Sequence, residues 1–281
     1  MRGVIFVNPN SGKDEPTVDE LTSAAHVLDV GVHVLEEDDD LGELARNANA
    51  EVLGMAGGDG SLAAVAQAAI ERDLPFVCIP WGTRNHFAGD VGLDGDDPLQ
   101  ALEAFRDGVE RRVDVGCVGE QVFLNNVSLG NYARLVHRRE RRRRRREAFA
   151  RLRALLATLG DRTRTEPFVI DGQPLRASVV LVANNEYKLD LLSIGERERV
   201  DGGTLAIYAA RGLRRLHWTE RKTPHVRIET RHKRVRAAID GEPAHLESPL
   251  EMRVEAGALR LLVPREKLDE QVGASGSSQD A

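Results

Sequence analysis

The sequence predicts two domains: an α/β domain with a parallel sheet, followed by a mainly antiparallel β domain. The length of 281 residues is enough for two domains of ordinary size. Strand-like runs alternate with helix-length segments in the first part, as they do in βαβ units. After about residue 117, short strands follow one another through Gly, Asn, Asp and Pro turns. We place the domains at residues 1–116 and 117–264, followed by a low-complexity tail at 265–281 that we expect to be partly disordered.

The elements of the first domain are expected in strict alternation. Apolar runs predict strands at residues 3–9, 32–37, 51–57, 75–82 and 111–119. Helical spacing predicts helices at residues 17–30, 41–50, 61–73 and 97–108. Ser61 would be the N-cap of the third helix, because its hydroxyl can accept a hydrogen bond from a free amide of the first turn.

The second domain is expected to consist of strands with one long helix among them. The strands are predicted within residues 121–133, 166–175, 177–185, 203–210, 225–242 and 250–264. The helix is predicted at residues 134–159, where arginine predominates.

Charge and composition limit the classes of protein that the chain can belong to. The net charge is −6, but the first third is acidic, whereas residues 134–153 and 221–236 are basic. This asymmetry predicts an anionic partner, such as a membrane surface, nucleic acid or a phosphorylated ligand. No apolar run reaches the roughly 18–20 residues of a membrane span, and the N-terminus reads as a strand rather than a signal peptide. Because Cys78 and Cys117 fit no metal-binding spacing, we expect a reduced, cytoplasmic environment.

Three polar turns follow predicted strands and should meet at one edge of the parallel sheet. They are N-P-N-S-G at residues 8–12, G-G-D-G-S at 57–61 and P-W-G-T-R-N at 80–85. Ligands of open α/β sheets bind at this edge, and backbone amides at a helix N-terminus attract phosphate. The turns therefore predict a nucleotide-phosphate site.

Asp59 lies in the middle of this expected phosphate site. A carboxylate beside a triphosphate is repulsive unless a divalent cation lies between them or the carboxylate accepts a proton from the acceptor hydroxyl. The alternative is that Asp59 is a turn residue that caps a helix.

These motifs, taken together, resemble those of the diacylglycerol kinase catalytic-domain family, which includes bacterial diacylglycerol and lipid kinases and sphingosine kinases. The resemblance rests on the three turns, extended through Phe87 and Ala88, and on D-G-E at residues 240–242. It implies an N-terminal three-layer α/β domain of the NAD kinase/diacylglycerol kinase type and a C-terminal β-sandwich, with the active site in the cleft between them. It also implies ATP and Mg²⁺, and a lipid alcohol as acceptor, with diacylglycerol as the default.

The resemblance also assigns roles to individual residues. Asp59 would act near the magnesium or as the catalytic base, and Glu242 is the other candidate for the base. Asp114 would join the acidic network around the metal, and Asp201 would be a structural metal ligand of the sandwich. The residues expected to contact the nucleotide are Asn8, Ser11, Gly12, Gly57, Gly58, Gly60, Ser61, Gly82, Thr83, Arg84 and Asn85.

One stretch departs from the family pattern. Where relatives have Gly-Thr-Gly-Asn-Asp, this chain has Arg84 in place of the second glycine and His86 in place of the acid. Arg84 could bind phosphate directly, and His86 could ligate a metal or a water molecule. The changes are either tolerated variants or signs of altered metal use, altered substrate or weak catalysis.

Several functional alternatives therefore stay open. The chain could be a lipid kinase, a related NAD kinase or a non-enzymatic binder of lipid or nucleotide. The helix expected at 134–159 could dock on an anionic membrane surface or be a solvated or partner-facing helix. Nucleic acid is disfavoured because the run lacks aromatic stacking groups. The sequence does not determine the oligomeric state, so a homodimer also stays open.

Overall fold

The computed structural model describes residues 2–12, 15–82, 85–93, 97–130, 165–187, 197, 199–210 and 218–267. The chain divides into two compact units, Met1–Val113 with Gly257–Ala281, and Asp114–Ala256. The sequence interpretation had assigned residues 117–264 to the second domain. The structure instead assigns the residues from Gly257 onward to the first unit. The reason is that the long strand β16 (Leu250–Val263) ends in the first unit, where Leu261 and Leu262 pair in parallel with Phe76 and Val77.

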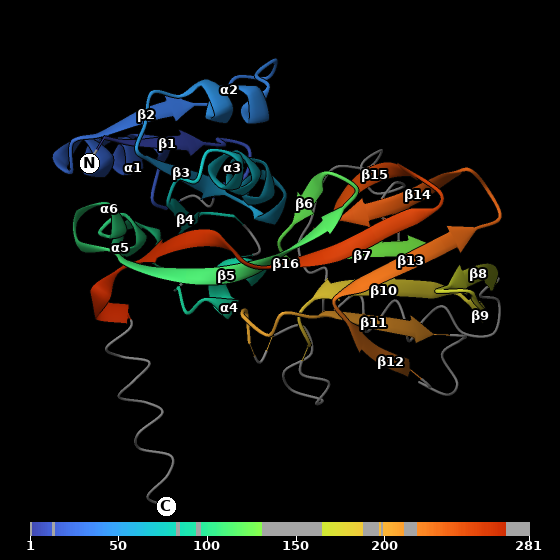
Figure 1. Cartoon of the computed structure of the whole chain (residues 1–281). Helices are drawn as coiled ribbons and strands as arrows, with labels where there is room; N and C mark the ends of the chain where they lie inside the picture. The colour runs from blue at the N-terminus through green and yellow to red at the C-terminus, as the bar shows by residue number, and fades with distance from the viewer. Residues whose placement is uncertain are drawn as a thin grey trace, which may run out of the picture. The chain divides into compact units, whose positions relative to one another are not determined.

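The first unit contains a parallel sheet, as predicted (Figure 1). Its strands lie in the order β2-β1-β3-β4, followed by the end of β16. The strands β3 and β4 are buried along their whole length, which is typical of parallel strands with both faces covered. The strands are β1 (Gly3–Val7), β2 (Val30–Val34), β3 (Val52–Gly57) and β4 (Phe76–Pro80).

Side-chain caps mark the first residues of α1 and α2 in this unit. Thr17 and Glu20 form a capping box before α1 (Val18–Val27), and Asp40 caps α2 (Leu41–Asn47). The expected single helix at 97–108 is wrong, because the chain forms two short helices there. The remaining helices are α3 (Asp59–Glu71), α4 (His86–Asp90), α5 (Pro98–Ala101) and α6 (Ala104–Asp107).

Ser61 is not the N-cap of α3, contrary to the prediction. The helix begins two residues earlier, at Asp59, and its N-cap is Gly58, which has no side chain to donate or accept a hydrogen bond. The Ser61 hydroxyl instead accepts a hydrogen bond from the Asn8 side chain at 3.0 Å. The first turn of α3 therefore starts directly from the end of β3.

The second unit is a β-sandwich, in agreement with the expected fold. One sheet has the antiparallel order β12-β11-β10-β7-β14-β15, and the other contains β16-β13-β8-β9. Buried side chains of both sheets, including Val180, Ile207 and Ile228, belong to one hydrophobic core. The strands not yet given are β5 (Val109–Val118), β6 (Gln121–Phe123), β7 (Asn126–Gly130), β8 (Glu166–Ile170), β9 (Gln173–Ala177), β10 (Val179–Asn184), β11 (Leu205–Ala210), β12 (Trp218–Thr223), β13 (His225–Thr230), β14 (Arg234–Ile239) and β15 (Glu242–Glu247).

Two parts of the sequence interpretation fall on residues that the structure does not describe. The helix expected at 134–159 lies wholly outside the described residues, as does the tail from residue 268 onward. Among the residues that are described, no helix has the length and apolar character needed to cross a membrane.

Candidate active site

The G-G-D-G-S turn joins β3 to α3 in the first unit. Gly58 has an extended backbone, and a Cβ atom built on it would meet no atom within 4 Å. A Cβ atom on Gly82 would instead lie 2.6 Å from the Cα atom of Gly58. Because this contact is between two backbones, only glycine fits at position 82. The second and third predicted turns therefore lie directly against each other.

The N-P-N-S-G turn is hydrogen-bonded to the end of β3 and the first turn of α3. The Asn8 backbone amide donates to the Ala56 carbonyl at 3.0 Å, and the Asn8 side chain donates to Ser61. A Cβ atom on Gly12 would overlap the ring of the buried Trp81, at 2.4 Å. All three turns predicted to form the phosphate site thus lie together.

Asn85 stabilises the third turn from within. Its side-chain oxygen accepts from the Gly82 amide at 3.0 Å, and its side-chain nitrogen donates to the carbonyls of Pro80 and Gly82. The amide of Asn85 therefore shapes the turn between β4 and α4. Thr83 and Arg84, the other expected nucleotide contacts of this turn, lie outside the described residues.

Asp59 connects the second turn to the start of α4. Its carboxylate, only 8% exposed, accepts hydrogen bonds from the backbone amides of Phe87 at 3.1 Å and His86 at 3.4 Å. The alternative considered from the sequence, that Asp59 caps a helix, is thus present. The helix whose first amides it accepts from is α4 rather than α3. Burial and the nearby charge of Asp59 raise the pKa of the Cys78 thiol well above its usual value.

Asp114 belongs to the second unit and is the centre of a buried polar network there. Its carboxylate accepts from the Gly203 amide at 2.6 Å and from the Asn185 side chain at 3.1 Å. Asn184 donates its side-chain nitrogen to the Asp114 carbonyl at 2.9 Å. Arg197, 5% exposed, donates to the carbonyls of Leu124 and Asn184.

The sequence interpretation missed Asn184, Asn185 and Arg197. The pair of asparagines at the end of the apolar run 177–183 was a usable signal, because polar residues at the end of a buried strand must find hydrogen-bond partners. Arg197 lies in the charged stretch E-R-E-R, so no pattern marks it as buried.

The D-G-E motif forms the hairpin turn between β14 and β15. Asp240 and Gly241 both have positive φ, 48° and 86°, as a two-residue type I′ turn requires. The Asp240 carboxylate accepts from three successive backbone amides, those of Leu124, Asn125 and Asn126, at 2.7–2.9 Å. Glu242 follows as the exposed first residue of β15.

The expected metal ligands belong to both units, Asp59 and His86 to the first and Asp114 and Asp201 to the second. Asp201 is exposed and forms an ion pair with Arg199 at 3.0 Å. His86 is half-buried at the start of α4. Within the described ranges there is no cluster of three or more His, Cys, Asp or Glu side chains that could hold a metal ion.

The fold is shared with solved kinase structures. A diacylglycerol kinase from Bacillus anthracis covers 94% of this chain and 98% of its own, with a TM-score of 0.70 and 19% identity. A yeast NADH kinase solved with NADH covers 97% of this chain, with a TM-score of 0.52 and 15% identity. At these identities the likeness concerns the fold alone, and it defines the class as the diacylglycerol kinase and NAD(H) kinase fold.

Sequence comparison shows which proteins the chain is similar to. Residues 2–118 match the diacylglycerol kinase catalytic domain model. The chain is 34% identical to Bacillus subtilis diacylglycerol kinase over 84 residues and 34% identical to a probable YegS-like lipid kinase of Chromohalobacter salexigens over 128 residues. These matches span only 28% and 40% of the two relatives, whereas a Mycobacterium tuberculosis diacylglycerol kinase is matched over 75% of its length at 28% identity. Residues 2–118 are therefore similar to the catalytic domain of this lipid kinase family, and the resemblance predicted from the motifs is confirmed.

Proposed function

We propose that the protein is an ATP-dependent lipid kinase that transfers the γ-phosphate of ATP to the hydroxyl of a lipid alcohol. Diacylglycerol is the proposed acceptor and phosphatidic acid the product. One observation carries the proposal: three turns after β1, β3 and β4 meet around Gly58 in a domain that matches the diacylglycerol kinase catalytic model.

The nucleotide phosphates would lie against the turn at Gly58. The open space beside its Cα atom allows close approach, and the N-terminal end of the 13-residue helix α3 favours negative charge. The proposed contacts among the described residues are Asn8, Ser11, Gly12, Gly57, Gly58, Gly60, Ser61, Gly82 and Asn85. Thr83 and Arg84 are proposed from the sequence motif alone.

The residues present fit a magnesium ion that is bound together with ATP. Mg²⁺ in phosphoryl-transfer sites is held by one or two carboxylates and by substrate phosphates, with water completing the shell. Asp59 is therefore a sufficient protein ligand from the first unit, and Asp114, His86 and Asp201 remain candidates from the motif resemblance. When bound, the ion neutralises the charge of the phosphate oxygens.

Two carboxylates remain candidates for the base that accepts the proton of the lipid hydroxyl. Asp59 is nearly buried and held by two backbone amides, so its position is fixed. Glu242 is exposed at the start of β15, directly after the turn that Asp240 holds. Glu242→Gln discriminates between them, with Glu247→Gln on the same strand as the matched control. Wild-type turnover in Glu242→Gln would exclude Glu242 as the base and leave Asp59, whereas its loss in Glu242→Gln alone would favour Glu242.

The decisive experiment is phosphorylation of a panel of lipid alcohols with labelled ATP and Mg²⁺. We expect label in extracted lipid with diacylglycerol, and loss of that label in Asp59→Asn. Label in NAD with none in any lipid would replace the proposal by NAD kinase activity. Bound ATP with no labelled product from either acceptor would support a non-catalytic binding protein.

The histidine at position 86, where the family pattern has an acid, is the observation that favours a non-catalytic binding protein, and it can be tested. The His86 amide donates to Asp59, so this side chain begins next to the proposed catalytic carboxylate. His86→Asp restores the acid of the family pattern. If histidine weakens cation binding, the variant reaches half-maximal turnover at a lower Mg²⁺ concentration. An unchanged Mg²⁺ dependence would mark histidine as a tolerated variant.

We also propose that the protein associates peripherally with anionic membranes through the arginine-rich residues 134–159. The support is compositional, because these residues lie outside the described ranges. Each basic residue near an anionic leaflet contributes on the order of 1 kcal/mol, which salt screens. Binding to anionic vesicles should therefore weaken as ionic strength rises, and binding independent of salt would contradict this proposal. Sedimentation equilibrium would show whether the chain is a homodimer.

A further inference from the structure

Trp81 connects two of the three turns of the candidate site. It lies directly after β4, is only 1% exposed, and precedes Gly82, whose backbone contacts Gly58. Its ring nitrogen Nε1 donates a hydrogen bond to the Pro16 carbonyl at 2.9 Å, across 65 residues of sequence. One side chain therefore reaches from the turn after β4 to the loop between β1 and α1.

The same ring determines which residue fits at position 12. A Cβ atom on Gly12 would lie 2.4–2.8 Å from three atoms of the Trp81 ring, Cζ2, Cη2 and Cε2. These distances are shorter than side-chain contacts allow, so the backbone of Gly12 packs directly on the indole. Because the indole is held in the close packing of the protein interior, it fixes the position of this backbone.

The N-P-N-S-G turn is thus fixed near both of its ends. At its start, the Asn8 side chain donates to Ser61, and the Ser11 amide donates to the Asn8 carbonyl, both at 3.0 Å. At its end, Gly12 packs on the ring of Trp81. Ser11, one of the proposed nucleotide contacts, lies between these two attachments.

We infer that Trp81 is a positioning residue for the nucleotide, because it holds the N-P-N-S-G turn in one place beside the G-G-D-G-S turn. This inference rests on the proposed kinase function and adds a residue to which the motifs assign no role. A binding loop that is already ordered loses less entropy when its ligand binds. Trp81 acts through Gly12 and Pro16, so its loss should affect the binding of ATP more than the transfer of phosphate.

The main test compares two buried aromatic residues of β4 and its turn, Trp81 and Phe76. Trp81→Phe keeps an aromatic ring but removes the Nε1 donor and ring atoms that lie nearest Gly12. Phe76→Leu is the matched control, because Phe76 is fully buried at the opposite end of β4. Urea unfolding should show both variants to be less stable than the wild type. Only Trp81→Phe should weaken equilibrium binding of ATP, by about fivefold or more.

Steady-state kinetics should show the same separation. In the labelled-ATP assay, Trp81→Phe should raise KM for ATP by about fivefold and lower kcat by less than about twofold. A fall in kcat without a change in KM, or equal loss of ATP affinity in Trp81→Phe and Phe76→Leu, would overturn the inference.

A double substitution tests the contact between Gly12 and Trp81 directly. Gly12→Ala places a methyl group against the indole and should weaken ATP binding by about fivefold or more. Trp81→Phe removes ring atoms that this methyl group would meet, so Gly12→Ala should have a smaller effect in that background. Equal effects of Gly12→Ala in the two backgrounds would contradict the positioning role.

Intrinsic fluorescence provides a measurement that leaves Trp81 in place. The chain has two tryptophans, so Trp218→Phe makes Trp81 the sole source of tryptophan emission. Because the indole contacts the turn at which ATP would bind, ATP should change this emission, with half-saturation at the dissociation constant found by equilibrium binding. Unchanged emission at saturating ATP would count against the inference.

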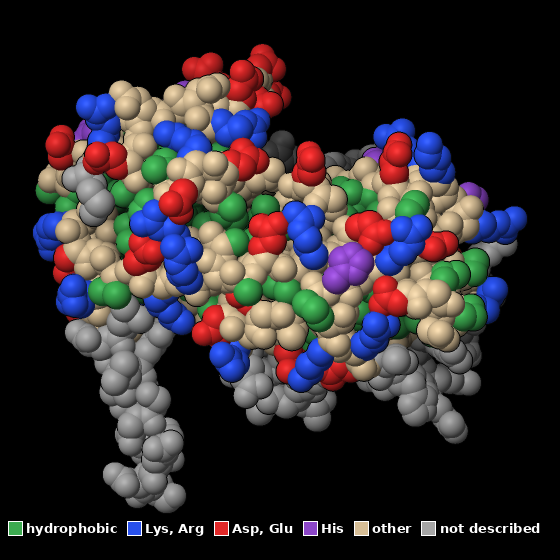
Figure 2. Space-filling view, in the orientation of Figure 1, with side chains coloured by type: hydrophobic (Ala, Val, Ile, Leu, Met, Phe, Trp, Pro, Cys, Tyr) green, Lys and Arg blue, Asp and Glu red, His purple; other side chains and the backbone are tan. Residues whose placement is uncertain are grey.

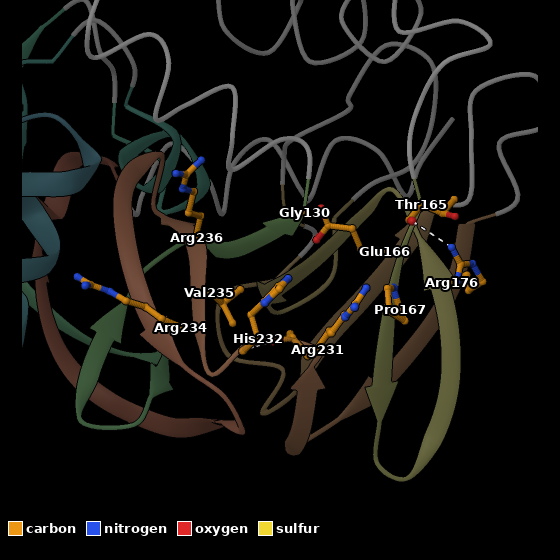
Figure 3. Close-up of a pocket in the computed structure, with 11 residues that line it drawn as sticks. Gly130, Thr165, Glu166, Pro167, Arg176, Arg231, His232, Arg234, Val235 and Arg236 are labelled. Atoms are coloured by element: carbon orange, nitrogen blue, oxygen red, sulfur yellow. Dashed lines mark hydrogen bonds between the residues drawn. The ribbon is translucent and has the colours of Figure 1, made fainter.

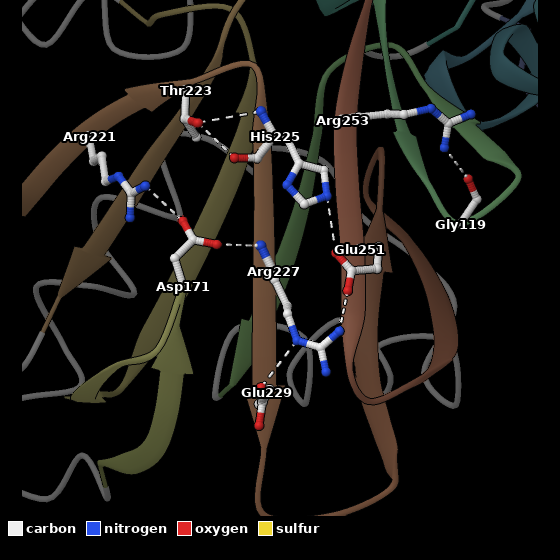
Figure 4. A network of polar contacts seen from close by, with 9 residues as sticks. All are labelled: Gly119, Asp171, Arg221, Thr223, His225, Arg227, Glu229, Glu251 and Arg253. Atoms are coloured by element: carbon white, nitrogen blue, oxygen red, sulfur yellow. Dashed lines mark hydrogen bonds and ion pairs between the residues drawn. The ribbon is translucent and has the colours of Figure 1, made fainter.

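Basic side chains of the second unit are the main competitors for ATP in these assays. A cavity of about 550 Å³ there is lined by several arginines, but Arg231 and Arg234 extend away from each other (Figure 3). Other arginines are paired, as in the 2.7 Å contact of Arg221 with Asp171 (Figure 4). On the face seen in Figure 2, basic and acidic side chains likewise alternate. These arginines are therefore expected to bind ATP weakly.

Arg234→Gln combined with Arg236→Gln controls for such binding and should change ATP affinity by less than about twofold. A loss as large as in Trp81→Phe would place the measured ATP outside the first unit and overturn the inference. Absence of ATP binding by the wild type would overturn the proposed function and this inference with it. Wild-type ATP affinity in Trp81→Phe would overturn the inference alone.

Discussion

The carboxylate of Asp59 accepts a hydrogen bond from the backbone amide of Phe87 at 3.1 Å, across 28 residues of sequence. The bond links the turn after β3 to the helix that follows β4. Asp59 is therefore both the proposed catalytic carboxylate and part of the structure that orients its own site.

This dual role predicts different effects for two substitutions of Asp59. Asp59→Asn keeps one oxygen acceptor and should lower the free energy of unfolding by about 1 kcal/mol, whereas Asp59→Ala removes both acceptors and should lower it by about 2–3 kcal/mol. Both variants should lose lipid phosphorylation. Urea unfolding and the labelled-ATP assay check this. Wild-type turnover in Asp59→Asn would contradict the catalytic role, and wild-type stability in Asp59→Ala would contradict the structural one.

Substitutions of Gly58 and Gly82 should have different effects, one on ATP affinity and the other on the free energy of unfolding. Gly58→Ala places a methyl group in open space with an ordinary φ of −86°, so the free energy of unfolding should change by less than about 0.5 kcal/mol while ATP affinity falls. Gly82→Ala forces its methyl group against the Gly58 backbone and should lower that free energy by about 2 kcal/mol or more. Urea unfolding with ATP titration measures both effects. Unchanged ATP affinity in Gly58→Ala would place the phosphates elsewhere.

Asp240→Asn should destabilise the second unit through its hydrogen bonds rather than through its backbone. Asparagine tolerates positive φ, so the turn conformation is kept, but three amides lose a charged acceptor. We expect a loss of about 2 kcal/mol in the free energy of unfolding. The matched control is Asp171→Asn at the other Asp-Gly turn, where the carboxylate accepts from one backbone amide, that of Arg227, and forms a partly exposed ion pair with Arg221. A larger loss in the control would refute the assignment.

The two cysteines should be unreactive in the folded protein. Burial, with a contribution from Glu255, raises the pKa of Cys117 to about 11, and burial also raises the pKa of Cys78 well above its usual value. Near pH 8, Cys117 should therefore react with a thiol reagent about a hundredfold more slowly than an ordinary thiol. Reaction with both thiols should follow unfolding in guanidinium. Rapid modification of the native protein would show that one of them is accessible as thiolate.

The pair of Glu110 and Arg260 predicts an acid-dependent part of stability. A hydrogen bond from Arg260 lowers the pKa of Glu110 below its ordinary value of 4.5. Because the folded state favours the ionised carboxylate, the pair stabilises the protein above that pH and is lost as the pH falls through the lower, folded value. Glu110→Gln should reduce the difference between urea midpoints at neutral and acidic pH. A difference as large in the variant as in the wild type would contradict this prediction.

The sequence predicted the sheet of the first unit well because its strands are continuous apolar runs, such as residues 52–57, followed by glycine turns. It missed β12 and β15, the two outer strands of their sheet, because W-T-E-R-K-T and E-P-A-H-L-E carry too few apolar residues to mark a strand. In β15, Ala244 and Leu246 do pack against the core, but this alternation is too short to mark a strand in the sequence.

For the candidate site, motifs predicted which turns meet but not what their side chains do. Asn85 and Asp59 were expected to face the nucleotide or its metal, and both also hold backbone amides or carbonyls of the turns themselves. Such contacts join residues that are distant in sequence or depend on the shape of the turn, so no local pattern reveals them. The hydrogen bonds of Asn184 and Asn185 with Asp114 were not predicted for the same reason.

Because the end of β16 pairs with β4, a fragment of the first unit must include residues from both ends of the chain. A fragment that stops at residue 118, where the family match ends, would leave the outer edge of β4 without its neighbour and prone to self-association. A synthetic peptide of residues 257–267 should then restore solubility when added in trans, as in fragment complementation. The first unit is therefore encoded by two separate stretches of the gene.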